Sequence, residues 1–363
     1  MSTPLEISCE WYSCFAAGFG FAFYYCGAGV YSSKHSTEVT ISRNQSLTWM
    51  CAAIGLSLCG VYILISSEIT AMQMAALEQT NLTIIETTYR DYSDYEIRIL
   101  AIGTVGVSCL AMTLAFTIPI RPIKDSLYEK TNHVNTIRDQ LKMVMWAIRQ
   151  KGLLKMAPFY LFTGFFTIFW LSIYTTAISF TESLAVYKNL AAYYCMAVMF
   201  GEVVVGVLMS YLNKRIKDFG LVPAMSMVIS MYSLASVLIV LYTPAESSIR
   251  PTSELSFCEP SYWVALLIGI FLGVVDGAMN NVRITAAARA VPSQPAIAFC
   301  ITKFYQALAS TIFYYLCSVL DAYQIVALMT FTLLAGLIGF ISLLKDLRGV
   351  HDAEKLPEKK IRI

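Results

Sequence analysis

Residues 262–281 read YWVALLIGIFLGVVDGAMNN and are the clearest indication of the fold class. This stretch is mostly apolar and about 20 residues long, so a helix rising 1.5 Å per residue would cross the hydrocarbon core of a bilayer. A charged side chain such as Asp276 is costly at that depth and marks a position with a chemical or structural task. The stretch therefore predicts a transmembrane helix with a polar group inside it.

Comparable apolar segments recur along the 363 residues, of which 57% are hydrophobic and 14% charged. The mean hydropathy is +0.61. Soluble domains are about a quarter charged, so most of this surface must face lipid. We predict an all-α polytopic membrane protein with about nine transmembrane helices. The predicted spans are residues 11–31, 47–67, 97–118, 158–180, 190–212, 221–242, 262–281, 296–319 and 323–344.

The basic residues predict the orientation of these helices. Of the 26 Lys and Arg residues, 21 lie in one alternating set of loops, four lie in the opposite set, and Lys303 lies within a span. Because loops rich in Lys and Arg remain in the cytoplasm, we expect a cytoplasmic carboxyl terminus and an amino terminus outside. Asn81, in the outer loop, begins an N-x-T sequence and is the predicted glycosylation site. Asn44 fits the same pattern on the cytoplasmic side and should stay unmodified.

The longest connection, residues 119–155, divides three spans from six. It ends in a basic amphipathic stretch, residues 137–155, that we expect to lie along the cytoplasmic membrane surface. Major facilitators have two six-helix halves joined by such a loop, each built from three-helix repeats. We therefore expect a major facilitator-like bundle that lacks the first three helices. The expected parts are a partial amino-terminal bundle (1–118), the interdomain loop (119–155), a six-helix bundle (156–344) and a cytoplasmic tail (345–363).

Polar side chains predicted at bilayer depth form the candidate functional site: Glu202, Asp276, Asn280, Lys303 and Gln306. Asp276, Asn280 and Arg283 recur at i, i+4 and i+7, which places them on one helix face. Asp276 and Lys303 lie roughly 10 Å deep from the same side on consecutive antiparallel helices, so an ion pair is available to them. Such a pair could line a path for a solute or for protons, or could only fix two helices. Glu202 could couple protons or serve packing.

Gly269, Gly273 and Gly277 fall every four residues along one edge of their predicted helix. Small residues at this spacing allow a neighbouring membrane helix to approach closely. We expect a tight helix–helix contact along this edge.

The sequence carries no motif of an enzyme or a metal site. It contains no G-x-S-x-G, no H-E-x-x-H, no P-loop and no Cys/His spacing suited to zinc. The net charge is only +2 and the basic residues are not pooled into one patch, which argues against nucleic acid as a partner. We expect no enzyme activity, no cofactor and no bound metal.

Residues 36–49 resemble the loop-to-helix motif of the uncoordinated-ninety-three-like (Unc-93-like) family, an atypical branch of the major facilitators. The residues that carry this match are Ser36, Ile41, Arg43, Asn44 and Trp49. Residues 201–206, 272–280 and 298–306 resemble three later motifs of the family, and the similarity is strongest to its major facilitator domain-containing subgroup. The resemblance covers the whole chain but begins at the family's fourth helix. Val282 departs from the family pattern, which usually has Gln there, and this weakens a polar central path.

The resemblance implies two functions of different kinds. Most members of the subgroup are transporter-like proteins without a known solute, which implies a solute transporter. Other relatives do not transport: one type regulates a potassium channel and another escorts Toll-like receptors. These imply an accessory subunit whose partner in the lipid bilayer, a channel or a receptor, completes the bundle. A truncated isoform with little activity is the third possibility. The plasma membrane or endosomal membranes are the expected location.

Overall fold

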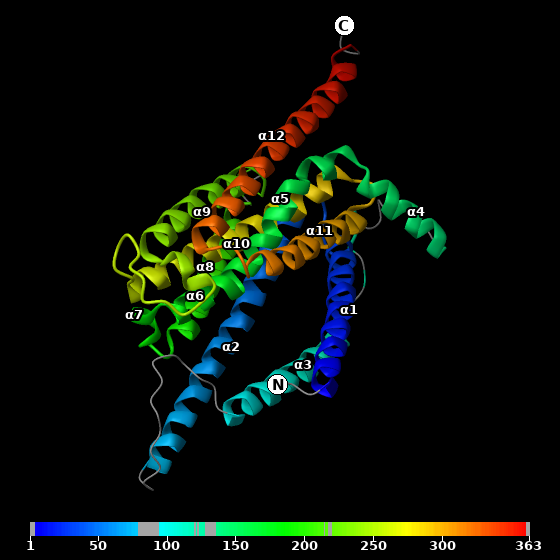
Figure 1. Cartoon of the computed structure of the whole chain (residues 1–363). Helices are drawn as coiled ribbons and strands as arrows, with labels where there is room; N and C mark the ends of the chain where they lie inside the picture. Colours follow the sequence, from blue (N-terminus) through cyan, green and yellow to red (C-terminus); the bar gives the residue numbers. More distant parts are fainter. Residues whose placement is uncertain are drawn as a thin grey trace.

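The computed structural model describes residues 4–78, 94–119, 121, 123–127, 136–213, 215–216 and 220–360. Within these residues, nine helices are long and apolar enough to cross a membrane, and no strand is formed (Figure 1). The prediction of an all-α protein with nine spanning helices is therefore confirmed. The chain is a multi-pass integral membrane protein.

The helices follow one another along the chain with few interruptions. They are α1 (Pro4–Lys34), α2 (Ile41–Glu78), α3 (Asp94–Ala115), α4 (Ile137–Ile148), α5 (Lys151–Ile168), the π-helical turn η1 (Phe169–Ile173), α6 (Tyr174–Phe180), α7 (Glu182–Ala185), α8 (Leu190–Leu212), α9 (Val222–Tyr242), the 3-10 turn η2 (Ala245–Ser248), α10 (Tyr262–Ala290), α11 (Pro295–Leu316) and α12 (Ala322–Lys360). The elements α5, η1 and α6 together form one span.

Three helices continue more than two turns beyond the predicted end of their span. Helix α2 reaches Glu78 instead of residue 67, α10 reaches Ala290 instead of residue 281, and α12 reaches Lys360 instead of residue 344. Arg283 lies beyond the predicted end of its span, but it is only 1% exposed. A helix continues through a cation when neighbouring helices supply its hydrogen-bond partners, so Arg283 does not mark a loop.

The loop predicted over residues 119–155 contains regular structure. Helix α4 occupies Ile137–Ile148, and α5 begins at Lys151 after a break at Arg149 and Gln150. The basic amphipathic stretch predicted over residues 137–155 is therefore divided between α4 and the first turn of α5.

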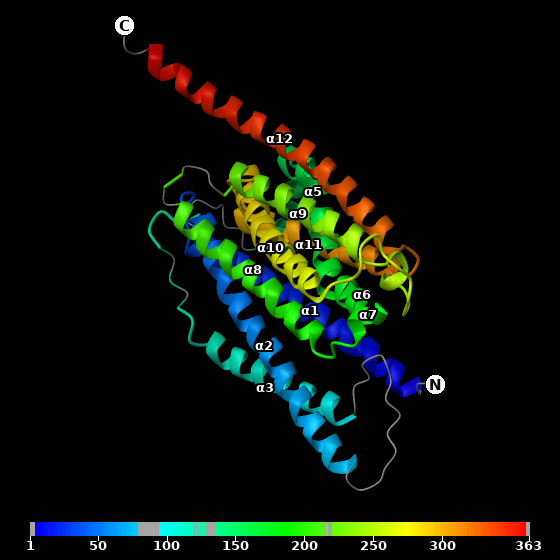
Figure 2. The ribbon, with the colours of Figure 1, turned by 90° about the vertical axis from the view of Figure 1, so that its left-hand side faces the viewer.

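The later spans form the core of the bundle. Helix α10 packs against α8 and α9, and both α11 and α12 pack against α5. Helix α2 packs along α8, and α1 packs against α11. In both ribbon views α3 and the far half of α2 project from this core (Figures 1 and 2). No residue in the spanning window of α3 is buried.

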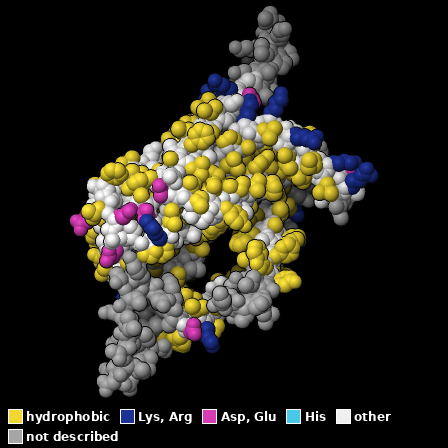
Figure 3. Space-filling view, viewed as in Figure 1, with side chains coloured by type: hydrophobic (Ala, Val, Ile, Leu, Met, Phe, Trp, Pro, Cys, Tyr) yellow, Lys and Arg dark blue, Asp and Glu magenta, His cyan; other side chains and the backbone are white. Residues whose placement is uncertain are grey.

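The connections predicted to share one side of the membrane meet at one end of the bundle. Lys155, near the start of α5, forms an ion pair of 2.5 Å with Asp346 of α12. A Cβ on Gly152 would meet Ala290, the last residue of α10, at 2.9 Å. We call this the basic end, because most Lys and Arg side chains visible in Figure 3 lie toward it. The Asp and Glu side chains in that view lie mostly toward the opposite end.

Candidate functional site

Asp276 lies in the middle of α10 and is 3% exposed. The indole Nε1 of Trp170 donates a hydrogen bond of 3.0 Å to its Oδ1. The amide Nδ2 of Asn280 donates to its Oδ2 at 2.9 Å. Both carboxylate oxygens therefore have a donor, as a buried carboxylate requires.

The hydrogen bonds continue from Asp276 toward the basic end. Arg283 donates from Nη2 to Asn280 Oδ1 at 3.1 Å and from Nη1 to Thr302 Oγ1 at 2.9 Å. One continuous chain of hydrogen bonds, which we call the polar relay, thus joins Trp170, Asp276, Asn280, Arg283 and Thr302. It connects the α5–η1–α6 span to α10 and α11.

Local helix geometry explains why these side chains meet. Asp276, Asn280 and Arg283 share one face of α10 through their spacing of four and three residues, as predicted. Trp170 lies in the π-helical turn η1, and single π-helical turns inside α-helices occur frequently at functional sites. The carbonyl of Trp170 accepts a hydrogen bond of 2.9 Å from the hydroxyl of Tyr194 on α8.

Glu202 of α8 joins the relay from the side. A Cβ on Gly277 would lie 3.8 Å from Glu202 Cα, so the two backbones are close at this point. The carboxyl of Glu202, which is 3% exposed, lies within hydrogen-bonding reach of the carboxyl of Asp276. A hydrogen bond between two carboxyl groups requires one proton, so this pair can hold a shared proton inside the bundle.

The close approach of α8 and α10 depends on glycines, as predicted. A Cβ on Gly273 would overlap the carbonyl oxygen of Val198, and a Cβ on Gly201 would overlap that of Ile270. A Cβ on Gly269 would meet the ring of Tyr194 at 3.0 Å. The prediction of a tight contact along this edge of α10 is confirmed.

Lys303 does not contact Asp276, the partner that the sequence predicted, but two aromatic rings. Among the ion pairs between described residues there is none between Lys303 and Asp276. Its Nζ lies 4.0 Å from the centroid of the Tyr25 ring of α1 and 5.5 Å from that of Trp49 of α2. The negative faces of these rings attract the ammonium group, while the Asp276 oxygens already have donors.

Gln306 lies one turn beyond Thr302 on α11 and belongs to a neighbouring contact. Its Nε2 donates to Thr167 Oγ1 of α5 at 3.0 Å. Three polar atoms in these packed helices have no hydrogen-bond partner among the described residues, namely Arg283 Nε, Gln306 Oε1 and Tyr160 Oη. They present one donor, one acceptor and one hydroxyl between α5, α10 and α11.

The residues that carry the resemblance to a family motif lie where α1 is joined to α2. Ser36 belongs to the turn, and Ile41, Arg43, Asn44 and Trp49 lie in the first three turns of α2. Asn44 donates from Nδ2 to Ser36 Oγ at 3.1 Å and to the carbonyl of His35 at 2.9 Å. Ile41 is 2% exposed. Neither Arg43 Nε nor Trp49 Nε1, both buried, has a hydrogen-bond partner among the described residues. The motif therefore has a structural role at the basic end, and none of its residues belongs to the polar relay.

The start of α2 is fixed onto α10 by residues that the sequence did not single out. Ser42 donates from Oγ to Asn281 Oδ1 at 2.8 Å, and Asn213 at the end of α8 donates to Ser42 Oγ at 2.9 Å. Asn281 Nδ2 also donates to Ser46 Oγ. The sequence signal for this second contact was the adjacent polar pair Asn280 and Asn281, because adjacent helical residues point toward different neighbours.

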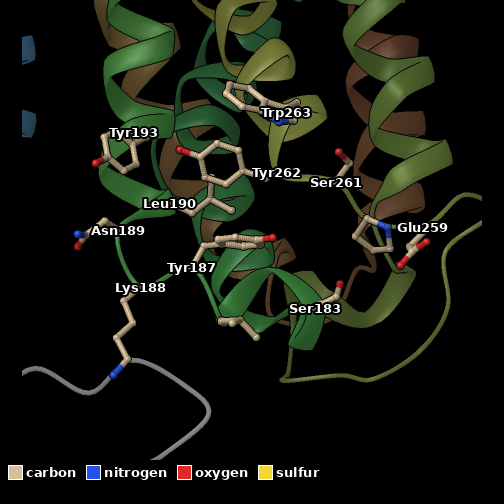
Figure 4. Close-up of a pocket in the computed structure, with 12 residues that line it drawn as sticks. Ser183, Tyr187, Lys188, Asn189, Leu190, Tyr193, Glu259, Ser261, Tyr262 and Trp263 are labelled. Atoms are coloured by element: carbon tan, nitrogen blue, oxygen red, sulfur yellow. The ribbon is translucent and has the colours of Figure 1, made fainter.

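No relay residue lines either of two clefts found on the surface of the described residues. The larger, about 830 Å³, lies at the opposite end and is lined by aromatic side chains (Figure 4). Tyr187 and Tyr262 lie with their ring centroids 5.1 Å apart, and Trp263 follows on α10. The smaller, about 560 Å³, lies along α4. Among the described residues no group of His, Cys, Asp and Glu is positioned to hold a metal ion.

The predicted glycosylation site, Asn81, lies outside the described residues.

A family model described as ion channel regulatory protein UNC-93 matches residues 9–341 of this chain. No solved structure matches it. The matched stretch contains every residue of the polar relay and the whole turn between α1 and α2.

Proposed function

Because the chain belongs to the UNC-93 family of ion channel regulatory proteins, we propose that it regulates an ion channel by binding to it within the membrane. The first partner to test is a potassium channel, and a receptor that needs an escort is the alternative partner. The proposed role is non-enzymatic and needs no cofactor.

The observation that supports this proposal is the internal pairing of the relay. Both carboxylate oxygens of Asp276 and both polar atoms of Asn280 have hydrogen-bond partners inside the protein. A solute site needs polar groups that are free to bind the solute, whereas these groups bind one another. The relay therefore serves as a polar brace that holds α10, α11 and the α5–η1–α6 span in one arrangement, and the outer faces of the bundle are left for a partner.

Recording currents tests the proposal. Potassium-selective channels are expressed with and without this chain, and the current density at equal channel surface expression is compared. We expect the chain to change the current. The Glu202→Gln variant should change it equally, because Gln keeps a hydrogen-bond donor and acceptor beside Asp276. If no channel or receptor changes its current, surface level or gating, the proposal is wrong.

Solute transport is the second candidate function, and the Glu202–Asp276 carboxyl pair favours it. Carboxyl groups that share a proton at bilayer depth are the usual elements of proton-coupled transport. The unpaired polar atoms of Arg283 and Gln306 could contact a small solute between α10 and α11. Uptake into proteoliposomes under a pH gradient, lost in Glu202→Gln, would support transport. A Glu202→Gln variant that still regulates a channel would separate the two functions.

We also propose a major facilitator architecture, in which α1–α3 correspond to the fourth to sixth helices. The order of elements along the chain supports this assignment: three spans come first, then a connection that contains α4, and then six spans. An experimental structure in which the six later spans do not form two related three-helix repeats would contradict it. The proposed location is the plasma membrane, with endosomal membranes as the alternative, and surface biotinylation distinguishes them.

A further inference from the structure

Helix α4 and its C-cap residue, Arg149, carry three basic residues on one outward face. Arg138, Lys142 and Arg149 fall within about 40° of one another when successive residues turn by 100°. All three are exposed, whereas Ala147 on the other face of α4 is fully buried. The cations therefore form a stripe along the helix, which we call the basic stripe. It lines the cleft of about 560 Å³.

Apolar side chains flank the basic stripe on both sides. Leu141 and Met145 are 62% and 50% exposed on one side, and Trp146 is 46% exposed on the other. Exposed apolar side chains next to cations characterise helices that lie at the interface of a membrane. Helix α4 directly precedes α5, where a candidate membrane span begins at Lys151, so we expect α4 at the level where lipid headgroups begin.

The described residues neutralise only part of the positive charge of the basic stripe. Lys142 pairs with Asp139 at 3.0 Å, and both side chains are largely exposed to solvent. Among the described residues, neither Arg138 nor Arg149 has an ion-pair partner. Within the part of the chain that the structure describes, these two guanidinium groups are not neutralised, and guanidinium groups bind phosphate through two parallel hydrogen bonds.

We propose that α4 binds the phosphorylated headgroup of an anionic lipid. Arg138 and Lys142 are one turn apart, about 6 Å along the axis, so two phosphates of one headgroup can contact both. Leu141 and Met145 then contact the glycerol and the upper acyl chains, and Trp146 lies at the headgroup level. A polyphosphoinositide fits this arrangement better than a lipid with one phosphate. This site is independent of the proposed regulation of a channel.

The test measures binding of short-chain phosphatidylinositol 4,5-bisphosphate to the full chain in detergent. The R138Q/K142Q/R149Q variant should bind about 100-fold more weakly, because each basic residue near an anionic surface contributes enough for about a fivefold change. The control variant R121Q/K345Q/R348Q also loses three exposed cations, two of them on α12. It should bind as the unmodified chain does. Equal losses in both variants would show attraction by net charge alone and would overturn the proposal.

Two further measurements decide between lipid and soluble ligand. Inositol 1,4,5-trisphosphate should bind at least tenfold more weakly than the lipid, and L141S/M145S should weaken binding of the lipid but not of the trisphosphate. Equal binding of both ligands to the unmodified chain would overturn the lipid as occupant. If the triple variant does not elute as a monodisperse protein, the single variants R138Q and R149Q replace it. Undiminished binding by both would contradict the site.

Discussion

The Nζ of Lys303 on α11 lies 4.0 Å from the centroid of the Tyr25 ring on α1. This contact connects one of the first three spans to the later six-helix bundle. The other contacts between these parts run mainly between α2 and α8 and, through Ser42, between α2 and α10. Lys303 therefore takes part in fixing the position of α1 and does not belong to the relay on α10.

A double-mutant cycle measures this contact. Tyr25→Leu should lower the free energy of unfolding, and the loss should shrink when Lys303 is already Met, because the attraction needs both partners. We expect a coupling energy of about 1–2 kcal/mol, since the ammonium group is withdrawn from water. Unfolding in mixed detergent micelles gives the four free energies. Tyr25→Phe keeps the ring face and is the control, and a coupling near zero would contradict the contact.

Trp170→Phe removes the donor to Asp276 and keeps an aromatic ring in η1. One hydrogen bond to a buried carboxylate is then lost, so we expect a loss of about 1.5–3 kcal/mol in stability. Thermal melting followed by size-exclusion chromatography should show a lower Tm. Trp263→Phe is the matched control, because its side chain is 76% exposed, and it should leave Tm nearly unchanged.

Gly273→Ala places a methyl group against the carbonyl oxygen of Val198. The backbones of α8 and α10 must separate to admit it, so we expect a loss of about 1–3 kcal/mol. Gly106→Ala on α3 meets no atom within 4 Å and should be neutral or slightly stabilising. Equal Tm values for the two variants would show that α8 and α10 are not in close contact.

Tyr194→Phe removes a buried hydrogen bond to the carbonyl of Trp170, with an expected loss of about 1 kcal/mol. Tyr160→Phe removes a buried hydroxyl that has no hydrogen-bond partner among the described residues, and it should be neutral or stabilising. The two substitutions are chemically identical, so their difference isolates the hydrogen bond. A larger loss for Tyr160→Phe would mean that its hydroxyl has a partner of another kind.

Glycosylation tests the predicted orientation. A mobility shift on glycosidase treatment should disappear in Asn81→Gln and persist in Asn44→Gln. The amide of Asn44 is already hydrogen-bonded within the turn at the basic end, where modification would disrupt the fold. A shift that depends on Asn44 would place the basic end outside the cytoplasm.

The sequence predicted the spans because each one is a long apolar run, a local property of the chain. It also placed Asp276, Asn280 and Arg283 on one face, because helical periodicity is local too. It did not predict Trp170 as their partner, since the π-helical turn shifts the face on which a side chain lies. The prediction that Lys303 pairs with Asp276 was wrong for a related reason. Depth in the membrane follows from sequence position, but the direction of a side chain around its helix depends on how the helices pack.

The glycine contacts between α8 and α10 restrict how the bundle can change shape. Two helices in backbone contact cannot rotate or slide relative to each other without separating first. Any functional motion must therefore carry α8 and α10 as one rigid block, and bending must occur in the chain segments outside this block. A spectroscopic label on α8 should accordingly report the displacement of α10.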